Sequence, residues 1–577
     1  MSRAVYVHSL GRTSLLAIGM AWLVFSGCGG GSSNPKPPMN PVLQSIAVSP
    51  QTTTVAAGLT QQFTASGNYS DGTSKALSSI TWATSDTSLA TVSTTGLVTA
   101  VKQGTVTVTA TSAGISGSTP LTVGAPELKS ISVSPQNEGV TAEVSQQFTA
   151  TGTYSDGSSG AVPGVNWMTD DATVATVSVT GLVTTLKEGS VTVVASAGGA
   201  RGTATLIVGP SLQSLSFSAN RTLKVGATHP KGVVVADFNG DGKPDIAVSL
   251  FDTNSIAVFL NQGTGTFGTP IMTAVQVSNN IGALAVGDFD EDGKQDLVLS
   301  TIAGGGQDNL VLLGKGDGTF IQQSPLPNSC GSITTTVVID LNTDKHQDLV
   351  LGCNGGGAQV YFGKGDGTFS DPISPPVPSF PGSFWGVAVA DFNGDGKLDI
   401  AGVDSGSPSF SSGSIDFYAG NGDGTFATPT TEALTVTFPF AATAGDFNND
   451  GKQDLLIGYP NDAVIDYGNG DGTFQDPSRL VYSPPAISQN GGISVLSADL
   501  LGIHKADAVT TDFNGGTVQI VLNAEIGNLP PGPGIFSFAL DPGVSSLAVG
   551  DLNGDGILDV VVSNYQTGEI TVMLSTQ

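Results

Sequence analysis

Two internal repeats of different length constrain this chain more than any other feature. Residues 43–50 (LQSIAVSP) recur as residues 128–135 (LKSISVSP), and Trp82 recurs as Trp167, each 85 residues later. From residue 210 onward, a motif that opens with aspartate recurs at intervals of 51 to 55 residues. Its copies begin at Asp237, Asp288, Asp340, Asp391, Asp446, Asp499 and Asp551. Repeats of these lengths predict two similar domains followed by seven smaller units.

The two 85-residue units, residues 42–124 and 127–209, have the pattern of β-sandwiches. Polar and apolar residues alternate in stretches such as residues 104–110 (GTVTVTA), and Asp-Gly and Thr-Gly turns separate the stretches. The Tyr-Ser-Asp-Gly at residues 69–72 and the Gly-Leu-Val-Thr at residues 96–99 recur in both units. These motifs resemble group 2 bacterial Ig-like domains. The resemblance implies surface spacer or adhesin modules and assigns no activity.

Each complete repeat in residues 212–577 contains four apolar segments that predict four strands. At about 50 residues per repeat, four strands are typical of one propeller blade, so we expect an all-β chain of two Ig-like sandwiches and a seven-bladed β-propeller. The last repeat is one strand short. We expect residues 214–225 to supply this strand and to pair with residues 569–574, which would remove the open sheet edges. The alternative is that this segment begins a third Ig-like domain.

The repeated aspartate motif has the composition of a calcium loop. In Asp237-Phe-Asn-Gly-Asp-Gly-Lys-Pro-Asp245, oxygen side chains occupy positions 1, 3, 5 and 9, and a glycine occupies position 6. Hard oxygen ligands are those that calcium prefers, although isolated Asn-Gly-Asp-Gly stretches are often simple turns. Aspartate at position 9 in every complete copy favours a metal. The expected calcium ligands of the five complete copies are Asp237, Asn239, Asp241 and Asp245; Asp288, Asp290, Asp292 and Asp296; Asp391, Asn393, Asp395 and Asp399; Asp446, Asn448, Asp450 and Asp454; and Asp551, Asn553, Asp555 and Asp559.

Two copies of the motif depart from the pattern. The third keeps Asp340, Asn342, Asp344 and Asp348 but has Lys345 in place of glycine, so a sixth calcium site is left open there. The sixth copy, residues 499–507, lacks the middle oxygens, and we expect it to bind no metal. The loops are not EF-hands, because position 12 is never glutamate and strands flank the loops. In register, the motifs resemble FG-GAP or VCBS repeats, which form the propellers of integrin α-subunits and occur in many bacterial surface proteins.

The N-terminal residues have the features of an export signal. Basic residues precede an apolar stretch, and residues 25–28 (FSGC) resemble a bacterial lipobox. The resemblance implies a signal peptide at residues 1–27, lipidation of Cys28, and, with Gly29 next, an outer-membrane lipoprotein. Residues 28–41 would form a flexible tether. Of the remaining cysteines, Cys330 and Cys353 flank one expected hairpin, and they form either a disulfide or two buried thiols.

The net charge of the chain limits the classes of partner that it can bind. Lysine and arginine total 20 against 48 aspartate and glutamate, a net charge of -28 that argues against nucleic acid and anionic membrane surfaces. The three histidines beyond the signal peptide are scattered, and neither Gly-x-Ser-x-Gly nor His-Glu-x-x-His occurs, so we expect no catalytic residues. We therefore expect a lipid-anchored surface protein of recognition or adhesion that binds a glycan or protein ligand. The alternative is an extracellular polysaccharide hydrolase or lyase on a propeller scaffold.

Overall fold

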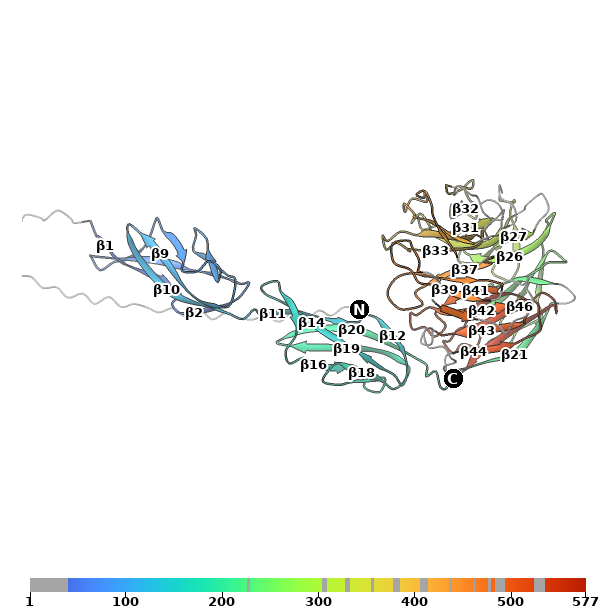
Figure 1. Cartoon of the computed structure of the whole chain (residues 1–577), viewed down its shortest axis with the longest axis horizontal. Coiled ribbons are helices and arrows are strands. Elements are labelled where there is room, and N and C mark those ends of the chain that lie inside the picture. The colour runs from blue at the N-terminus through green and yellow to red at the C-terminus, as the bar shows by residue number, and fades with distance from the viewer. Residues whose placement is uncertain are drawn as a thin grey trace, which may run out of the picture. The chain divides into compact units, whose positions relative to one another are not determined.

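The computed structural model describes residues 40–225, 229–302, 309–326, 333–353, 357–376, 384–404, 413–434, 438–460, 462–475, 479–482, 493–522 and 535–576. These residues form strands and turns without a helix, so the described chain is all-β (Figure 1). It divides into two compact units, one of residues up to Glu127 with Ser155–Gly157, and one of the remaining residues. Within the described ranges, no helix has the length and apolar character that a membrane crossing needs. The expected signal peptide, most of the tether, Cys28 and Cys330 lie outside the described residues.

The first Ig-like domain has ten strands in three small sheets. The sheet orders are β1-β4-β5, β2-β10-β9-β6 and β3-β8-β7. The strands are β1 (Leu43–Ser49), β2 (Thr53–Ala56), β3 (Thr60–Gln62), β4 (Thr64–Tyr69), β5 (Ser74–Ala76), β6 (Thr81–Thr84), β7 (Ala90–Val92), β8 (Leu97–Ala100), β9 (Gly104–Ser112) and β10 (Ile115–Gly124).

The second Ig-like domain repeats this topology strand for strand, with sheet orders β11-β14-β15, β12-β20-β19-β16 and β13-β18-β17. The strands are β11 (Leu128–Ser134), β12 (Glu138–Thr141), β13 (Ser145–Gln147), β14 (Thr149–Tyr154), β15 (Ser159–Ala161), β16 (Asn166–Thr169), β17 (Ala175–Val177), β18 (Leu182–Thr185), β19 (Gly189–Ala197) and β20 (Ala200–Gly209). The 85-residue sequence repeat is thus a repeat of structure as well.

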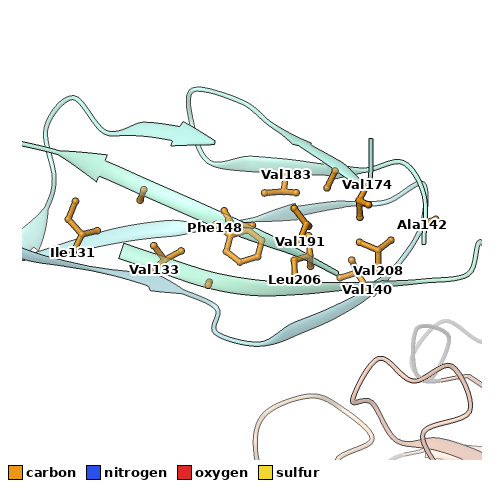
Figure 2. Close-up of a cluster of buried hydrophobic side chains, with 14 of the residues drawn as sticks. Ile131, Val133, Val140, Ala142, Phe148, Val174, Val183, Val191, Leu206 and Val208 are labelled. Atoms are coloured by element: carbon orange, nitrogen blue, oxygen red, sulfur yellow. The ribbon is translucent and has the colours of Figure 1, made fainter. Parts of the chain in front are cut away.

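The alternating sequence places one face of each long strand in the core. In β9, Val106, Val108 and Ala110 are buried, while the threonines between them face outward or lie partly exposed. In the second domain, Figure 2 shows Phe148 among the aliphatic side chains of the facing strands, and its side chain is fully buried. Burial of this apolar face is what stabilises each sandwich.

The repeat region forms seven sheets among the described residues. Six of them are meanders in chain order, and the first strand of each precedes an aspartate motif. The sheets are β22 (Pro230–Ala236), β23 (Asp245–Leu250), β24 (Ser255–Phe259) and β25 (Ile271–Ala274); β26 (Asn280–Gly287), β27 (Asp296–Ile302), β28 (Leu310–Gly314) and β29 (Phe320–Gln322); β30 (Ile333–Ile339), β31 (Asp348–Cys353) and β32 (Gly357–Tyr361); β33 (Phe384–Ala390), β34 (Asp399–Asp404), β35 (Ser414–Tyr418) and β36 (Thr430–Ala433); β37 (Ala441–Gly445), β38 (Asp454–Gly458), β39 (Ala463–Asp466) and β40 (Arg479–Tyr482); β41 (Ile493–Ala498), β42 (Asp507–Asp512), β43 (Thr517–Val521) and β44 (Ile535–Ala539); and β45 (Val544–Gly550), β46 (Asp559–Asn564), β47 (Glu569–Thr576) and β21 (Ser216–Lys224).

These seven sheets close on one another as the blades of a propeller do. The first strands of successive sheets contact each other, and β22 of the first sheet also contacts β45 of the last. The second strand of a sheet is buried on both of its faces, as every residue of β23 is, because neighbouring sheets cover it on either side. This burial explains why the second strands read as nearly continuous apolar runs.

The closing strand comes from before the first repeat. Residues of β21 pair antiparallel with β47, from Ser216 opposite Thr576 to Lys224 opposite Glu569. This pairing is the one expected for residues 214–225, and it excludes the alternative that they begin a third Ig-like domain. The third sheet differs from the other six, because its described residues form three strands. There, a single bridge between Val360 and Ile373 stands where the fourth strand begins elsewhere.

Candidate metal centre

All seven aspartate loops connect the first strand of a sheet to the second. In the first sheet, the loop starts directly after β22 ends at Ala236, and Asp245 at position 9 is the first residue of β23. The position-9 aspartates Asp296, Asp348, Asp399, Asp454, Asp507 and Asp559 each begin the second strand of their own sheet. The loops therefore recur at one place in the fold.

The aspartate at position 1 holds the backbone of its loop. In the first loop, Asp237 Oδ1 accepts hydrogen bonds from the backbone N–H groups of Gly240 (2.7 Å) and Asp241 (3.2 Å), and Oδ2 accepts one from Gly242 (2.7 Å). The equivalent bonds to Asp391 and Asp551 are present in the fourth and seventh loops. This carboxylate therefore organises the turn in addition to offering oxygens to a cation.

The aspartate at position 9 is buried and fully engaged by the fold. Asp245 Oδ2 accepts from the N–H of Phe238 (3.0 Å), and Oδ1 accepts from the N–H of Asn261 (2.7 Å) just after β24. Burial raises the pKa of Asp245 to about 6, against the lowering effect of these two hydrogen bonds. Burial likewise raises the pKa of Asp296, Asp454 and Asp559 to about 6. Aspartate at position 9 is thus required by the backbone itself, and its recurrence is weaker support for a metal than the sequence indicated.

The loop backbone has one conformation in all seven repeats. Positions 4 and 6 both have positive φ, as in Gly240 (74°) and Gly242 (82°) of the first loop. Non-glycine residues adopt the same angles in the third loop, where Thr343 and Lys345 have φ of 64° and 77°. The lysine at position 6 therefore does not prevent the third loop from forming, although positive φ strains its backbone.

The second loop gathers the densest set of carboxylates. Ligand oxygens of Asp288, Asp290 and Asp296, at positions 1, 3 and 9, all lie within 4.8 Å of one another. Asp292 at position 5 was expected to complete the set. Instead it accepts the backbone N–H of Lys294 (3.0 Å) and forms an ion pair with the Lys294 ammonium. The structure thus brings together three of the four expected carboxylates.

The same lysine pairing recurs at position 5 of three other complete loops. Asp241 Oδ2 lies 2.9 Å from Lys243 Nζ, and the corresponding distances are 3.4 Å for Asp395 and Lys397 and 3.7 Å for Asp450 and Lys452. Pairs as exposed as these contribute little to stability, so a cation could displace the lysine at low cost. In the seventh loop, Ile557 replaces the lysine, and the Ser575 hydroxyl lies 3.4 Å from both oxygens of Asp555.

The third loop contains a carboxylate oxygen that the protein does not satisfy. Asp340 Oδ1 is buried and has no hydrogen-bond partner, whereas Asp340 Oδ2 accepts the N–H of Lys345 (2.9 Å). Asn342 and Asp344 lie in the same turn, with the N–H of Asp344 donating to Asn342 Oδ1 (2.9 Å), and Asp348 is buried at position 9. A buried, unpaired carboxylate oxygen is costly, and a bound cation would satisfy it. The residues of this loop therefore fit a hard divalent ion.

Outside the loops, sequence reasoning missed several buried carboxylates and one packing role. Asp404, Asp416, Asp466 and Asp512 are buried in the second or third strands of their sheets. Cys353 in β31 is buried and disulfide-bonded, while its expected partner Cys330 lies outside the described residues, so the pairing stays a prediction.

The sixth loop was expected only to lack metal, yet Leu501 and Ile503 in it are buried. Apolar residues at positions 3 and 5 of that loop were the available signal.

The fold and loops together define an all-β protein in which tandem Ig-like domains precede a propeller of aspartate-loop repeats. The model of the bacterial Ig-like domain (group 2) matches residues 42–123 and 127–208. The FG-GAP-like repeat model matches residues 237–299, 340–402, 407–457 and 446–510, and the FG-GAP repeat model matches residues 543–573. The chain therefore contains two group 2 bacterial Ig-like domains followed by FG-GAP repeats.

Among curated proteins, Ice-binding protein 1 of Shewanella frigidimarina is 40% identical over 168 residues, which are 29% of this chain and 19% of that protein. Human integrin alpha-IIb is 28% identical over 149 residues, 21% of this chain and 14% of the integrin. The chain thus spans less than a fifth of the length of these relatives. A solved structure of an Agrocybe aegerita lectin, described as recognising non-reducing terminal N-acetylglucosamine, has a TM-score of 0.40 and 21% identity, covering 59% of this chain and 87% of the lectin.

Proposed function

We propose that this chain is a lipid-anchored recognition or adhesion protein of the bacterial surface. Two Ig-like spacers would present a calcium-stabilised propeller, and the propeller would bind a glycan or protein ligand. The domain types support an extracellular setting, because relatives that share parts of the chain include an ice-binding protein and an integrin α-subunit. The convergence of Asp288, Asp290 and Asp296 is the observation that carries the calcium part of the proposal.

Calcium would act on the stability of the propeller. Three carboxylates whose ligand atoms lie within 4.8 Å repel one another unless a cation balances their charge. Oxygen donors at positions 1, 3 and 9 are of the hard type that calcium selects over softer metals. The five complete loops are the proposed sites, and the unpaired Asp340 Oδ1 adds support for a sixth site in the third loop.

The number of sites is tested by titrating calcium into the metal-free chain by calorimetry and by equilibrium dialysis with radioactive calcium. Five sites, or six with the third loop, agree with the proposal. Asp340→Asn distinguishes these two results, because it should remove one site if the third loop binds and none if it does not. Binding of no calcium at millimolar concentration, where extracellular modules are commonly occupied, would refute the calcium part of the proposal.

The propeller face away from the aspartate loops is the proposed ligand surface. A recess of about 340 Å³ lies there, lined by residues that include Asp541, Asn564, Thr567 and Glu569. Asn564 and Thr567 belong to the connection between β46 and β47, and such connections vary in length from sheet to sheet. Variable connections on a rigid scaffold commonly carry recognition, and the polar lining suits hydroxyl-rich ligands such as glycans.

A glycan array, followed by affinity measurements, tests the recognition part of the proposal. Thr567→Arg fills the recess with a long side chain, and Gln262→Arg is the matched control because Gln262 is exposed in a hairpin turn at the aspartate-loop face. We expect Thr567→Arg to weaken binding at least tenfold and Gln262→Arg to leave it unchanged. A polysaccharide-depolymerisation screen run beside the array tests the alternative, and turnover by the chain would overturn a purely binding role.

The anchor is tested separately from the ligand. Replacing the predicted lipidation site by Cys28→Ser should move the protein from the membrane fraction to the soluble fraction. Incorporation of a labelled fatty acid should be lost in the same variant. Unchanged fractionation would mean that the FSGC segment is not a lipidation signal in this chain.

A further inference from the structure

The sixth loop keeps the backbone of the other loops but replaces their oxygens by apolar side chains. Asp499 at position 1 accepts the N–H groups of Ile503 (2.9 Å) and His504 (2.6 Å), and His504 has the positive φ (60°) of position 6. Leu501 and Ile503 stand at positions 3 and 5, where complete loops have Asn or Asp. The turn therefore forms without any of the middle metal ligands.

These apolar side chains are buried, unlike their counterparts. Leu501 is 6% exposed and Ile503 is 5% exposed, whereas Asp241 at the equivalent position of the first loop is exposed. They belong to a cluster that includes Phe217 of the closing strand, and Ile207 of β20 packs against that cluster. Because β20 is a strand of the second Ig-like domain, the apolar cluster crosses from the propeller into that domain.

Two glycines of the second Ig-like domain lie against the sixth loop. A Cβ added to Gly139 in β12 would lie 1.7 Å from the carbonyl oxygen of Ile503, and one added to Gly209 in β20 would lie 2.6 Å from Ile503 Cγ2. At Gly139 the obstacle is backbone, so a larger residue there would push the loop away; at Gly209 the Ile503 side chain would have to move. Beside this contact, Lys505 Nζ lies 3.2 Å from Glu138 Oε1, and both side chains are less than a quarter exposed.

The first Ig-like domain lacks three of the residues with which the second domain contacts the propeller. At the positions 85 residues earlier, Thr53, Thr54 and Thr122 replace Glu138, Gly139 and Ile207. The two domains otherwise share their strand order and core, so the three replaced residues are not needed to make the Ig-like fold. Their presence only in the domain that adjoins the propeller points to a function in contact with the propeller.

We propose that the sixth aspartate loop has exchanged a cation site for a docking site, and that its occupant is the second Ig-like domain of the same chain. The joint couples that domain to the propeller, and the two unfold as one cooperative unit. Most of the second Ig-like domain and the propeller lie in one compact unit of the chain. The joint uses apolar contact and one ion pair, so it forms with or without calcium. This proposal does not depend on the identity of the ligand or on calcium binding elsewhere.

The test compares two substitutions on opposite sides of the joint in the full chain. Gly139→Thr introduces the residue that the first domain carries at Thr54, and Ile503→Asp restores the aspartate of a complete loop. The matched control is Thr54→Gly, the reverse exchange in the first domain. Differential scanning calorimetry follows the transitions, and hydrogen exchange of β12 and β20 reports on the second Ig-like domain directly, in calcium and in chelator.

We expect the second Ig-like domain to melt together with the propeller in the unmodified chain. Each substitution should release a separate transition about 5 °C or more lower, with faster exchange in β12 and β20, and the double variant should add little further. Thr54→Gly should leave both readouts of the second domain unchanged. An effect of Gly139→Thr without an effect of Ile503→Asp would mean that the glycine serves the Ig-like domain alone, and would overturn the proposal. So would unchanged transitions and exchange in both variants.

Discussion

The backbone N–H of Leu500 donates a 2.8 Å hydrogen bond to the buried carboxylate of Asp507, in the one loop that lacks the middle oxygens. The same bond joins Phe238 to Asp245 in a complete loop. The ninth residue is therefore aspartate because its carboxylate, at the start of the second strand, accepts the backbone N–H of the second loop residue. Positions 3 and 5 differ from position 9, because the sixth loop replaces their oxygens by Leu501 and Ile503 and still keeps the turn.

Asp507→Ala should destabilise the propeller whether or not calcium is present. The substitution leaves the buried N–H of Leu500 without its acceptor, which costs about 2 kcal/mol in the free energy of unfolding. Chemical denaturation in calcium and in chelator measures this loss, and the two values should agree. A loss confined to calcium-containing buffer would mean that Asp507 acts as a metal ligand after all.

Asp241→Ala, in contrast, should destabilise the propeller only when calcium is present. Asp241 is exposed, and its carboxylate accepts the exposed N–H of Lys243 (3.0 Å) within its own turn, where water can replace it, so its removal should cost stability only when calcium is bound. At a hundredfold excess of calcium over its dissociation constant, one site contributes roughly 2.7 kcal/mol. Calorimetry should show this difference in calcium, and none in chelator. An equal loss in both buffers would contradict a metal role for position 5.

Removal of calcium from the unmodified chain should affect its domains unequally. Chelation should lower the melting temperature of the propeller and, through the docked sixth loop, that of the second Ig-like domain. The first Ig-like domain should melt unchanged, because no aspartate loop belongs to its fold. Domain-resolved hydrogen exchange during a thermal ramp separates the three responses. Identical propeller transitions with and without chelator would mean that the loops are turns and nothing more.

Asp290→Asn should weaken calcium binding in the second loop and stabilise that loop without calcium. The substitution gives the second loop the asparagine found at position 3 of the other complete loops, and it removes one of three converging negative charges. Asn239→Asp in the first loop is the reciprocal change and should have the reciprocal effects. Calcium titration measures the first effect and denaturation in chelator measures the second. A gain of affinity in Asp290→Asn would argue that the three carboxylates do not share one ion.

The pH dependence of propeller stability should include a contribution from Asp416, which belongs to β35 and not to an aspartate loop. Burial raises the pKa of Asp416 to about 6, from an unfolded value of 3.8, while the Thr431 hydroxyl donates to it over 2.6 Å. The folded state therefore binds more protons between these two pKa values, and the free energy of unfolding falls as pH rises from about 4 to about 6. Asp416→Asn should raise stability at pH 7.5 by about 3 kcal/mol and leave it unchanged near pH 4.

The exposed Asp423 provides the control for this experiment. Its pKa is lowered by hydrogen bonds from Thr425 and not raised by burial, so Asp423→Asn should give no gain at pH 7.5. Urea denaturation in chelator across pH 4 to 8 measures both variants without interference from calcium. Equal behaviour of the two variants would mean that burial does not penalise the Asp416 charge.

The architecture was predictable because its signals are local and repeated. Alternation in residues 104–110 indicated which face of β9 is buried, and the spacing of the aspartate motif indicated one sheet per repeat. The missing strand after Glu569 pointed to β21 as its replacement. The short third sheet was not foreseen, and nothing in the structure explains why Val360 and Ile373 pair at one bridge only.

The sequence predicted which residues form the candidate site, but it did not predict which partners their side chains contact. The sequence pattern gives Asp292 and Asp290 as equal ligands, but the pattern alone does not show that the Lys294 ammonium of the same loop pairs with Asp292. It likewise assigns Ile503 to a defective loop, because the glycine that receives this residue lies in another domain, more than 360 positions earlier. A near neighbour decided the first outcome, and a side-chain contact distant in the sequence decided the second.

The pairing of β21 with β47 can form only after β47 has been synthesised. Ser216 meets Thr576 across 360 residues, whereas each Ig-like domain contains all its strand partners within one 85-residue unit. Domains generally fold as they emerge from the ribosome or the translocation channel, so both Ig-like domains can be complete while the propeller is still open. Until β47 emerges, β21 has no partner and the ring presents unpaired edges to other chains. The emergence of β47 therefore determines how long the unpaired β21 needs protection from aggregation.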